Sequence, residues 1–310
     1  MTSATDRDTY MGFVGVTTAR SSIMDVFPRW AAVLGLPTDR LIGHDIPIGA
    51  PPETYRDVVR AIKGDPNQWG ALVTTHKIAV FEAAGDLFDD LDDLARTFGE
   101  ISSIAKRGSR LTGAAKDPVT VRLALEDFLP PDHFSRTGAA ALVLGSGGSG
   151  TALSYQLGVR ADRPSRVICT ARSELRLAHQ RDLHARAGIA PGLMEYVVAP
   201  DPHDADEILA KLPPASLVVN ATGMGKDRPG SPISDAGRFP QNGVVWEFNY
   251  RGSLEFLALA RRQKAERGLV IEDGWRYFVH GWTQVIADVF DIPMPRAMVD
   301  ELALVAAGVR

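Results

Sequence analysis

A glycine-rich turn near the middle of the chain has residue types and a spacing that could do chemistry. The segment Gly145-Ser146-Gly147-Gly148-Ser149-Gly150 fits G-x-G-x-x-G and lies between an expected strand, 139–144, and an expected helix, 151–157. Glycines there permit a tight turn, a close approach of backbone N–H groups to a pyrophosphate, and close packing of helix on strand. The helix N-terminus then faces the phosphate charge. The segment predicts a dinucleotide site, with a glycine-rich loop of another α/β domain as the alternative.

The end of the next expected strand, 166–170, indicates which dinucleotide binds. A carboxylate at this point would hydrogen-bond the ribose hydroxyls of NAD, but the chain has Arg172 and Ser173. A guanidinium offers a fixed fork of donors to phosphate oxygens, which suits the 2′-phosphate of NADP. Glu174 follows directly and leaves NAD use open. We therefore expect NADP(H) as the cofactor.

The elements that must position this site alternate between strands and helices. In the first third, strands are expected at 11–17, 40–47 and 69–74, and helices at 23–36, 52–63 and 77–94. Later strands are expected at 139–144, 166–170, 193–198, 216–220 and 243–248. The last part predicts helices at 254–267 and 282–291, with a short apolar run at 268–271 between them. This alternation predicts an α/β fold with mostly parallel sheets covered by helices.

Length predicts two domains, because 310 residues are many for a single core. A composition shift at Pro130-Pro131-Asp132 comes just before the strongest strand signal. We expect an N-terminal α/β domain over residues 1–117, completed by C-terminal helices from about 270 to 310. A Rossmann dinucleotide-binding domain is expected over residues 118–269.

Composition excludes several classes of partner and site. The net charge is −4 without a block of like charges, which argues against nucleic acid or an anionic membrane as the main partner. Cys169 is the single cysteine, so an intrachain disulfide is ruled out and no metal site is expected. The first ten residues are polar, with Asp6, Arg7 and Asp8, and no apolar run reaches the ~20 residues of a membrane span. We expect a cytoplasmic protein.

Motifs along nearly the whole chain resemble the shikimate dehydrogenase family. The family's Ser-x-Ser turn looks like Ser21-Ser22-Ile23, and its Asn-Val-Thr-x-Pro-x-Lys segment looks like 73–77, one residue shorter and without the proline. Further similar segments are Gly99–Ser103, Gly113–Asp117, Asn220–Met224, Glu247–Tyr250 and Gly274–Gly281. The resemblance implies a substrate domain followed by a Rossmann domain, and an NADP-dependent dehydrogenase acting on a small polar ring compound.

The resemblance also implies a role for each matching residue. Lys77 matches the family's catalytic lysine, and Asp117 matches its partner aspartate. The residues that match substrate contacts are Ser21, Thr74, Ser102 and Tyr250. The residues that match cofactor contacts are Gly145 to Gly150, Arg172, Ser173, Asn220, Thr222, Phe248 and Gly274.

The chemistry of a lysine and an aspartate fits this reaction. Reduction of a ketone needs a hydride and a proton, and an ammonium can supply the proton and stabilise the developing oxyanion. The usual lysine pKa of ~10.4 is high for a base near neutral pH, so partial burial must lower it. Asp117 would orient both Lys77 and a substrate hydroxyl. The residues alone leave a structural salt bridge, or two unrelated surface charges, as the alternative.

The match fails at positions that bind the substrate. Ile23 replaces the second serine, the two family asparagines fall at Ser102 and Ala115, and the late glutamine falls at Gly281. Each lost hydrogen-bonding group is worth ~1–3 kcal/mol, so shikimate itself should bind weakly. We expect a related substrate, such as a cyclitol-like or amino-substituted ring or a quinate analogue.

Other interpretations stay open at this point. One is a shikimate 5-dehydrogenase of aromatic amino acid biosynthesis whose pocket uses different side chains. Another is an NADP(H)-binding sensor without turnover. The sequence leaves the physiological direction open, and the oligomeric state is expected to be a monomer or a homodimer.

Overall fold

The computed structural model describes residues 8–226 and 228–309 and divides the chain into two compact units. The first consists of Met1–Lys116 and Val279–Arg310, and the second of Asp117–Phe278. Asp6 and Arg7, two of the polar amino-terminal residues on which the expected cytoplasmic location depends, lie outside the described residues. Within the described residues, no helix is long and apolar enough to cross a membrane.

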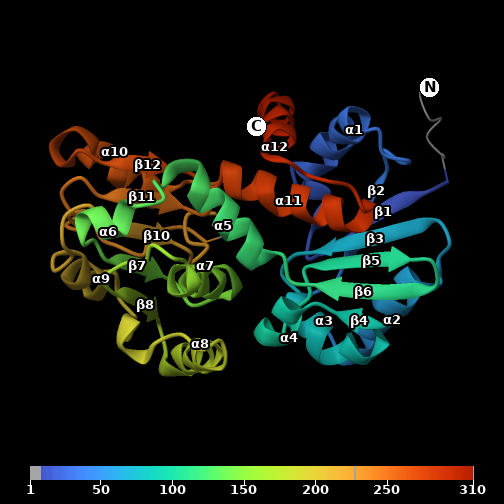
Figure 1. The fold of residues 1–310 in the computed structure, drawn as a ribbon, viewed down its shortest axis with the longest axis horizontal. Coiled ribbons are helices and arrows are strands. Elements are labelled where there is room, and N and C mark those ends of the chain that lie inside the picture. The colour runs from blue at the N-terminus through green and yellow to red at the C-terminus, as the bar shows by residue number, and fades with distance from the viewer. Residues whose placement is uncertain (1–7, 227, 310) are drawn as a thin grey trace. The chain divides into compact units, whose positions relative to one another are not determined.

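The first unit is built on a mixed six-stranded sheet in the order β2-β1-β3-β5-β6-β4 (Figure 1). Its strands are β1 (Tyr10–Gly15), β2 (Leu41–Asp45), β3 (Gln68–Val73), β4 (Asp90–Leu91), β5 (Ser103–Arg107) and β6 (Arg110–Ala114). Its helices are α1 (Ile23–Leu34), α2 (Pro52–Gly64), α3 (Lys77–Ala84), α4 (Asp93–Phe98) and α12 (Arg296–Ala307), with short turns at Thr18–Arg20 and Gly85–Leu87. The strands β1, β2 and β3 are parallel, and β5 runs antiparallel to both of its neighbours.

Helices cover both faces of this sheet, because consecutive residues of β1 and β3 are buried on both sides. On one face, Val14 and Val73 pack with Tyr55 and Val59 of α2 and Val80 of α3. On the other face, α1 packs against α12, where the Trp30 indole N–H donates to the Leu302 carbonyl at 2.8 Å. The Phe13 ring also meets the Trp282 ring edge to face there, with 4.9 Å between their centres.

The second unit has a parallel sheet in the order β12-β11-β10-β7-β8-β9. Its strands are β7 (Ala141–Leu144), β8 (Val167–Ala171), β9 (Met194–Val198), β10 (Leu217–Asn220), β11 (Val244–Glu247) and β12 (Val270–Glu272). Its helices are α5 (Asp117–Phe128), α6 (His133–Thr137), α7 (Gly148–Val159), α8 (Glu174–Arg186), α9 (Pro202–Leu209) and α10 (Glu255–Arg267), with a short turn at Pro191–Leu193. Helix α11 (Trp275–Phe290) begins in this unit and ends in the other. This is the Rossmann arrangement, in which strand order reverses between β7 and β10.

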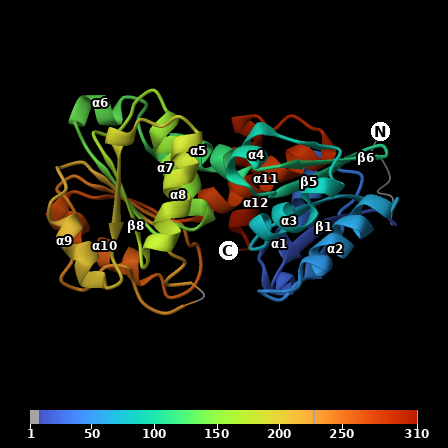
Figure 2. The same cartoon turned by 90° about the horizontal axis from the view of Figure 1, so that it is seen from below.

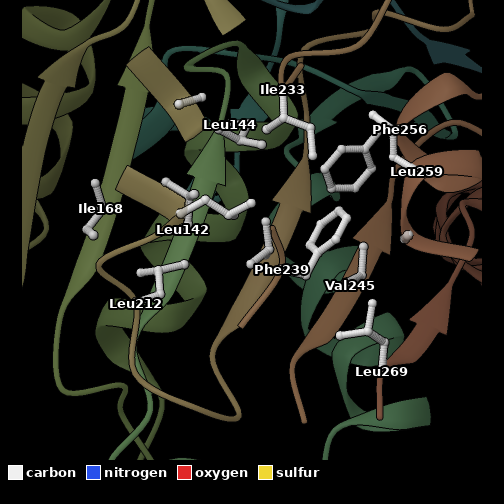
Figure 3. Close-up of a cluster of buried hydrophobic side chains, with 14 of the residues drawn as sticks. Leu142, Leu144, Ile168, Leu212, Ile233, Phe239, Val245, Phe256, Leu259 and Leu269 are labelled. Carbon is white, nitrogen blue, oxygen red and sulfur yellow. The ribbon is translucent and has the colours of Figure 1, made fainter. Parts of the chain in front are cut away.

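The core of the second unit lies between its sheet and the helices α9 and α10, which share one side of the sheet (Figure 2). Leu142 and Leu144 of β7 and Val245 of β11 point toward Phe256 of α10 and toward Phe239 (Figure 3). The opposite side carries α7 and α8, which contact β7, β8 and β9. Because both faces are covered, β7, β8, β10 and β11 are buried along their whole length and mostly apolar.

Three expectations about the elements were wrong. The helix expected over 77–94 ends at Ala84, and a second helix begins after Asp92, whose carboxylate accepts from the Ala95 N–H at 2.6 Å. The expected helix 282–291 begins earlier, at Trp275. The hairpin of β5 and β6 was not expected, although Gly108, with φ +63°, lies in its tight turn.

Candidate functional site

The glycine-rich turn joins β7 to α7, and its three motif glycines meet different surroundings. Gly145 has φ +107°, and a Cβ there would lie 2.8 Å from the Ala221 carbonyl oxygen. A Cβ on Gly150 would lie 2.0 Å from the Gly145 carbonyl oxygen. A Cβ on Gly147, the N-cap of α7, would meet nothing within 4 Å. The turn therefore needs two glycines for its own packing and leaves open space at the third, beside the helix N-terminus.

A pocket of about 380 Å³ opens beside this turn, at the carboxyl ends of β7, β8 and β10. The expected cofactor contacts that line it are Gly145, Ser146, Gly147, Arg172 and Thr222. The other expected contacts do not line it; they are Gly148, Ser149, Gly150, Ser173, Asn220, Phe248 and Gly274. Ser146 uses its hydroxyl internally, donating to the Thr170 carbonyl at 3.0 Å. In the described parts of the chain, no group of three or more His, Cys, Asp or Glu residues is placed to hold a metal ion.

Three guanidinium groups border the pocket. Arg172 follows β8, Arg176 lies in the first turns of α8, and Arg228 comes from the loop after β10. Among the described residues, the structure places no carboxylate within ion-pair distance of these three side chains. Exposed cations without a carboxylate partner, next to a helix N-terminus, form a site for a multiply charged anion such as a phosphate.

Glu174, the residue that left NAD use open, is engaged elsewhere. Its carboxylate forms an ion pair with Arg181 of the same helix at 2.9 Å. The Arg181 guanidinium in turn lies over the Tyr196 ring, 4.8 Å from its centre. The arrangement turns the carboxylate toward α8 and leaves the guanidinium of Arg172 as the polar group at the end of β8.

Asn220 is buried behind the pocket wall. Its side-chain oxygen accepts from the Thr222 N–H at 3.1 Å and the Thr222 hydroxyl at 2.6 Å. Its amide nitrogen donates to the Glu247 carboxylate at 2.7 Å. Burial raises the pKa of Glu247 to about 7, while hydrogen bonds from Asn249 and Asn220 oppose that shift. Asn220 thus holds Thr222 in the wall and does not itself reach the pocket.

The remaining expected contacts of the second unit lie in an aromatic cluster. Phe248 stacks on Tyr277 with 4.6 Å between ring centres. Tyr250 lies 4.6 Å from the Phe278 ring and 5.6 Å from the Trp275 ring. Gly274 approaches so closely that a Cβ there would lie 2.0 Å from the Phe248 carbonyl oxygen. The cluster fixes the segments that follow β11 and β12.

In the first unit, Thr74, Lys77 and Ser102 come together at one edge of the sheet. The Val73 N–H donates to the Ser102 carbonyl at 2.9 Å, and the Ile101 N–H donates to the Lys77 carbonyl at 3.0 Å. This edge contains the carboxyl ends of the parallel strands β1 and β3. It also contains the amino end of β5, because β5 runs antiparallel to β3. Lys77 is half-buried as the first residue of α3. The sheet therefore brings the expected lysine and two expected substrate contacts to the same edge.

Ser21 belongs to the turn that follows β1. Its N–H donates to the Thr18 carbonyl at 3.0 Å. Thr18 and Thr74 are neighbours, since each would lie 3.2 Å from a Cβ on Gly15. Ile23 begins α1 and is fully buried in the core. The position of the second family serine is therefore an apolar core position here.

His76, next to Lys77, has a structural environment. It is buried, its Nε2 lies 2.8 Å from the Ile46 carbonyl oxygen, and its Nδ1 lies 3.4 Å from the Tyr55 hydroxyl. Both ring nitrogens thus have partners within the first unit. His76 fixes the start of α3, which carries Lys77, to the segment after β2.

The segment after β6 leads to Asp117. The Ser102 hydroxyl accepts from the Lys116 N–H at 2.7 Å. Ala115 is fully buried, and its N–H donates to the Asp92 carboxylate at 3.2 Å. Asp117 follows directly, as the first residue of α5 and of the second unit. Its side chain is buried, with 9% exposed.

Sequence reasoning missed Arg176, Arg228 and Glu247. Arg176 could have been found, because it lies only four residues after Arg172 in the sequence. Arg228 and Glu247 carried no local signal: Arg228 reaches the pocket only through the loop after β10, and Glu247 is significant only because Asn220 and Asn249 surround it.

A parallel Rossmann unit with a glycine-rich turn, joined to a mixed-sheet α/β unit that carries a half-buried lysine, defines a two-unit protein of the dinucleotide-binding class. No family model matches the chain. A curated relative from Methylobacterium radiotolerans, named shikimate dehydrogenase (NADP(+)), is 30% identical over 271 residues, which is 86% of this chain and 86% of the relative. A relative of the same name from Symbiobacterium thermophilum is 31% identical and covers 74% of this chain and 73% of its own length.

Solved structures share the fold. Quinate dehydrogenase from Corynebacterium glutamicum, in complex with NAD, matches with a TM-score of 0.75 at 19% identity, over 98% of this chain and all of the other. The 5-ketofructose reductase of a Gluconobacter species matches with a TM-score of 0.70 at 17% identity, again over 98% of this chain and all of the other. The chain belongs to the shikimate dehydrogenase family and is an oxidoreductase.

Proposed function

We propose that the chain transfers a hydride between NADP(H) and a small polar ring compound, interconverting a hydroxyl and a ketone. The observation that carries the cofactor half is the pocket that Arg172, Arg176 and Arg228 line together with Gly147, the N-cap of α7. NADP(H), when bound, supplies or accepts the hydride. The two curated relatives carry NADP(+) in their names, which agrees with the arginines.

Lys77 is the proposed proton donor and acceptor, and Asp117 its partner. A half-buried ammonium at the start of α3 can give a proton to a developing alkoxide and stabilise its charge. Thr74 and Ser102 lie at the same sheet edge and offer hydroxyls to a polar ring. Tyr250 and Ser21 are the further proposed substrate contacts.

The proposed ring is related to shikimate but distinct from it. Ile23 and Ala115 are fully buried apolar residues where the family has hydrogen-bonding groups, and Gly281 has no side chain to offer. A pocket that lacks several donors rejects a ligand that requires them, by ~1–3 kcal/mol for each group. The fold also occurs in proteins named for other substrates, quinate and 5-ketofructose.

A substrate panel followed by NADPH absorbance tests the proposal. Shikimate, quinate, aminoshikimate and inositols are offered with NADP⁺, and the corresponding ketones with NADPH. We expect turnover with at least one ring compound, and turnover of shikimate that is slower by 100-fold or more. Efficient turnover of shikimate would instead make the chain a shikimate 5-dehydrogenase, and the absence of turnover with NADPH bound would indicate a sensor.

The cofactor preference is tested with Arg172→Ala. Loss of a charge-assisted hydrogen bond of about 1.5–3 kcal/mol should raise the KM for NADPH by about 10- to 100-fold and leave the KM for NADH unchanged. Arg261→Ala removes the same charge from an exposed position of α10 that does not line the pocket, and we expect it to leave both values unchanged. An equal loss of affinity for both cofactors in Arg172→Ala would argue against a 2′-phosphate contact.

A further inference from the structure

The loop after β10 forms one wall of the proposed cofactor pocket. Thr222, Met224 and Arg228 line the pocket from this side. The wall also contacts the glycine turn, since the Thr222 Cα would lie 3.0 Å from a Cβ on Gly145. The conformation of this short segment therefore sets the shape of the pocket opposite the helix N-terminus.

Hydrogen bonds fix both backbone groups of Met224. Its N–H donates to the Thr222 hydroxyl at 3.1 Å, and its carbonyl accepts from the Asn249 amide at 3.0 Å and the Asn220 amide at 3.3 Å. The Thr222 hydroxyl in turn donates to the Asn220 side-chain oxygen at 2.6 Å. Two asparagines, at the ends of β10 and β11, thus hold the wall from behind.

One buried carboxylate determines the orientation of both asparagines. Glu247 is fully buried, and its Oε2 accepts from the Asn220 amide nitrogen at 2.7 Å. Its Oε1 accepts from the Asn249 amide nitrogen at 2.7 Å and the Asn249 N–H at 2.8 Å. All three partners are donors aimed at acceptors. A glutamine at position 247 would point its NH₂ group at one of these donors. Asn220 could flip its side-chain amide to accept from that NH₂ group, but its own NH₂ group would then face the Thr222 N–H.

The same carboxylate is linked, through Asn249, to the segment that follows β12. Glu247 holds Asn249, whose backbone carbonyl accepts from the Gly274 N–H at 3.2 Å. Phe248 lies between Glu247 and Asn249 and packs against Gly274. Glu247 therefore connects the loop that lines the pocket with Phe248 and Gly274, two residues that the family resemblance matches to cofactor contacts.

From this geometry we propose that Glu247 is a positioning residue for the cofactor: it holds the Thr222–Met224 wall in its binding conformation through Asn220 and Asn249. The inference rests on the proposed function, because it assigns Glu247 to the NADP(H) pocket. Glu247 touches no reacting atom, so its removal should affect cofactor binding much more than the rate at saturation.

The test compares Glu247→Gln with a charge-conserving swap. Glu247→Gln should raise the KM and the Kd for NADPH by about 10- to 100-fold, with kcat at saturating cofactor within about threefold of wild type. In Glu247→Gln/Asn220→Asp, the new amide can donate to the new carboxylate, whose other oxygen still accepts from Thr222. The swap loses the 3.3 Å bond from Asn220 to the Met224 carbonyl and keeps the 3.0 Å bond from Asn249. It should therefore return most of the lost affinity, with a Kd at least threefold lower than that of Glu247→Gln.

Two further variants make the outcome decisive. Glu272→Gln makes the same substitution on the neighbouring strand β12 and should leave the Kd unchanged. Asn249→Ala keeps two of the three donors to Glu247 and should raise the Kd for NADPH about five- to tenfold. This variant tests the inference even if Glu247→Gln does not fold.

The outcomes separate this inference from the proposed function. A folded Glu247→Gln or Asn249→Ala with wild-type affinity would overturn the inference alone, as would a swap no better than the single variant. A wild-type chain that binds no NADPH would overturn the proposed function, and the inference with it.

Discussion

The hydroxyl of Ser102 accepts a hydrogen bond from the N–H of Lys116 at 2.7 Å and lies 3.3 Å from the Ala114 carbonyl, to which it donates. Ser102 directly precedes β5, and its buried side chain thus fixes the backbone at Ala114 and Lys116, immediately before Asp117. Ser102 was expected from sequence as a substrate contact; the residue is buried, and the described hydrogen bonds of its hydroxyl anchor backbone.

Ser102→Ala should therefore lower activity through this anchor. It leaves the Lys116 N–H without its acceptor, at a cost of about 1–3 kcal/mol in the free energy of unfolding. We expect kcat/KM to fall about tenfold, measured at a temperature where the variant is folded. Ser216→Ala is the matched control, because that hydroxyl also accepts from a backbone N–H and donates to a carbonyl, in the other unit. Equal activity losses in the two variants would indicate a general effect of stability.

Two glycines of the turn should respond differently to alanine. Gly147→Ala adds a Cβ that meets no protein atom within 4 Å at an ordinary φ of −81°, so the melting temperature should change little. The same Cβ occupies the space beside the helix N-terminus, and we expect the Kd for NADPH to rise at least tenfold. Gly150→Ala places a Cβ 2.0 Å from a carbonyl oxygen and should cost about 1–3 kcal/mol of stability. Thermal melts and NADPH titrations of both variants check this; unchanged affinity in Gly147→Ala would contradict the assigned site.

Stability should fall in mild acid because of His184. Its Nδ1 lies 2.7 Å from the Tyr196 hydroxyl and its Nε2 lies 2.9 Å from the Ser154 hydroxyl, and burial lowers its pKa to about 4. The unfolded chain takes up a proton near pH 6.5 and the folded chain does so only near pH 4. The contribution of His184 is thus complete above about pH 6.5 and is lost as pH falls toward about 4, by up to about 3 kcal/mol.

His184→Gln should flatten that pH dependence. Melting temperatures of the wild type and the variant, measured between pH 4.5 and pH 7.5, provide the comparison. His179→Gln, at an exposed position of the same helix, should retain the wild-type slope. A wild-type slope in His184→Gln would show that other groups cause the acid sensitivity.

The sequence predicted the features that local physics determines. A run of apolar residues, a G-x-G-x-x-G turn and a helix are contiguous, so the junction of β7 and α7 could be predicted from residues 139–157. Arg172 was predictable for the same reason, since it follows a strand directly. The α/β class and the family were also predictable and are confirmed by the parallel strands and by the relatives.

Features that depend on distant residues could not be predicted. The helix expected over 77–94 is divided because residues Asp90–Leu91 form β4 and pair with β6, a distant partner that periodicity does not show. Asn220 was expected to touch cofactor, but its buried amide binds Glu247, a partner 27 residues away.

The central claim is that this chain moves a hydride with Lys77 handling the proton, and one measurement tests it most directly. The rate of NADP⁺ reduction with the best ring substrate is compared between wild type and Lys77→Met, which keeps the length of the side chain and removes its charge. We predict that kcat falls by about 10²- to 10⁴-fold, as for the loss of a general acid–base group, while the Kd for NADPH changes less than threefold. A Lys77→Met protein with wild-type kcat would contradict the account.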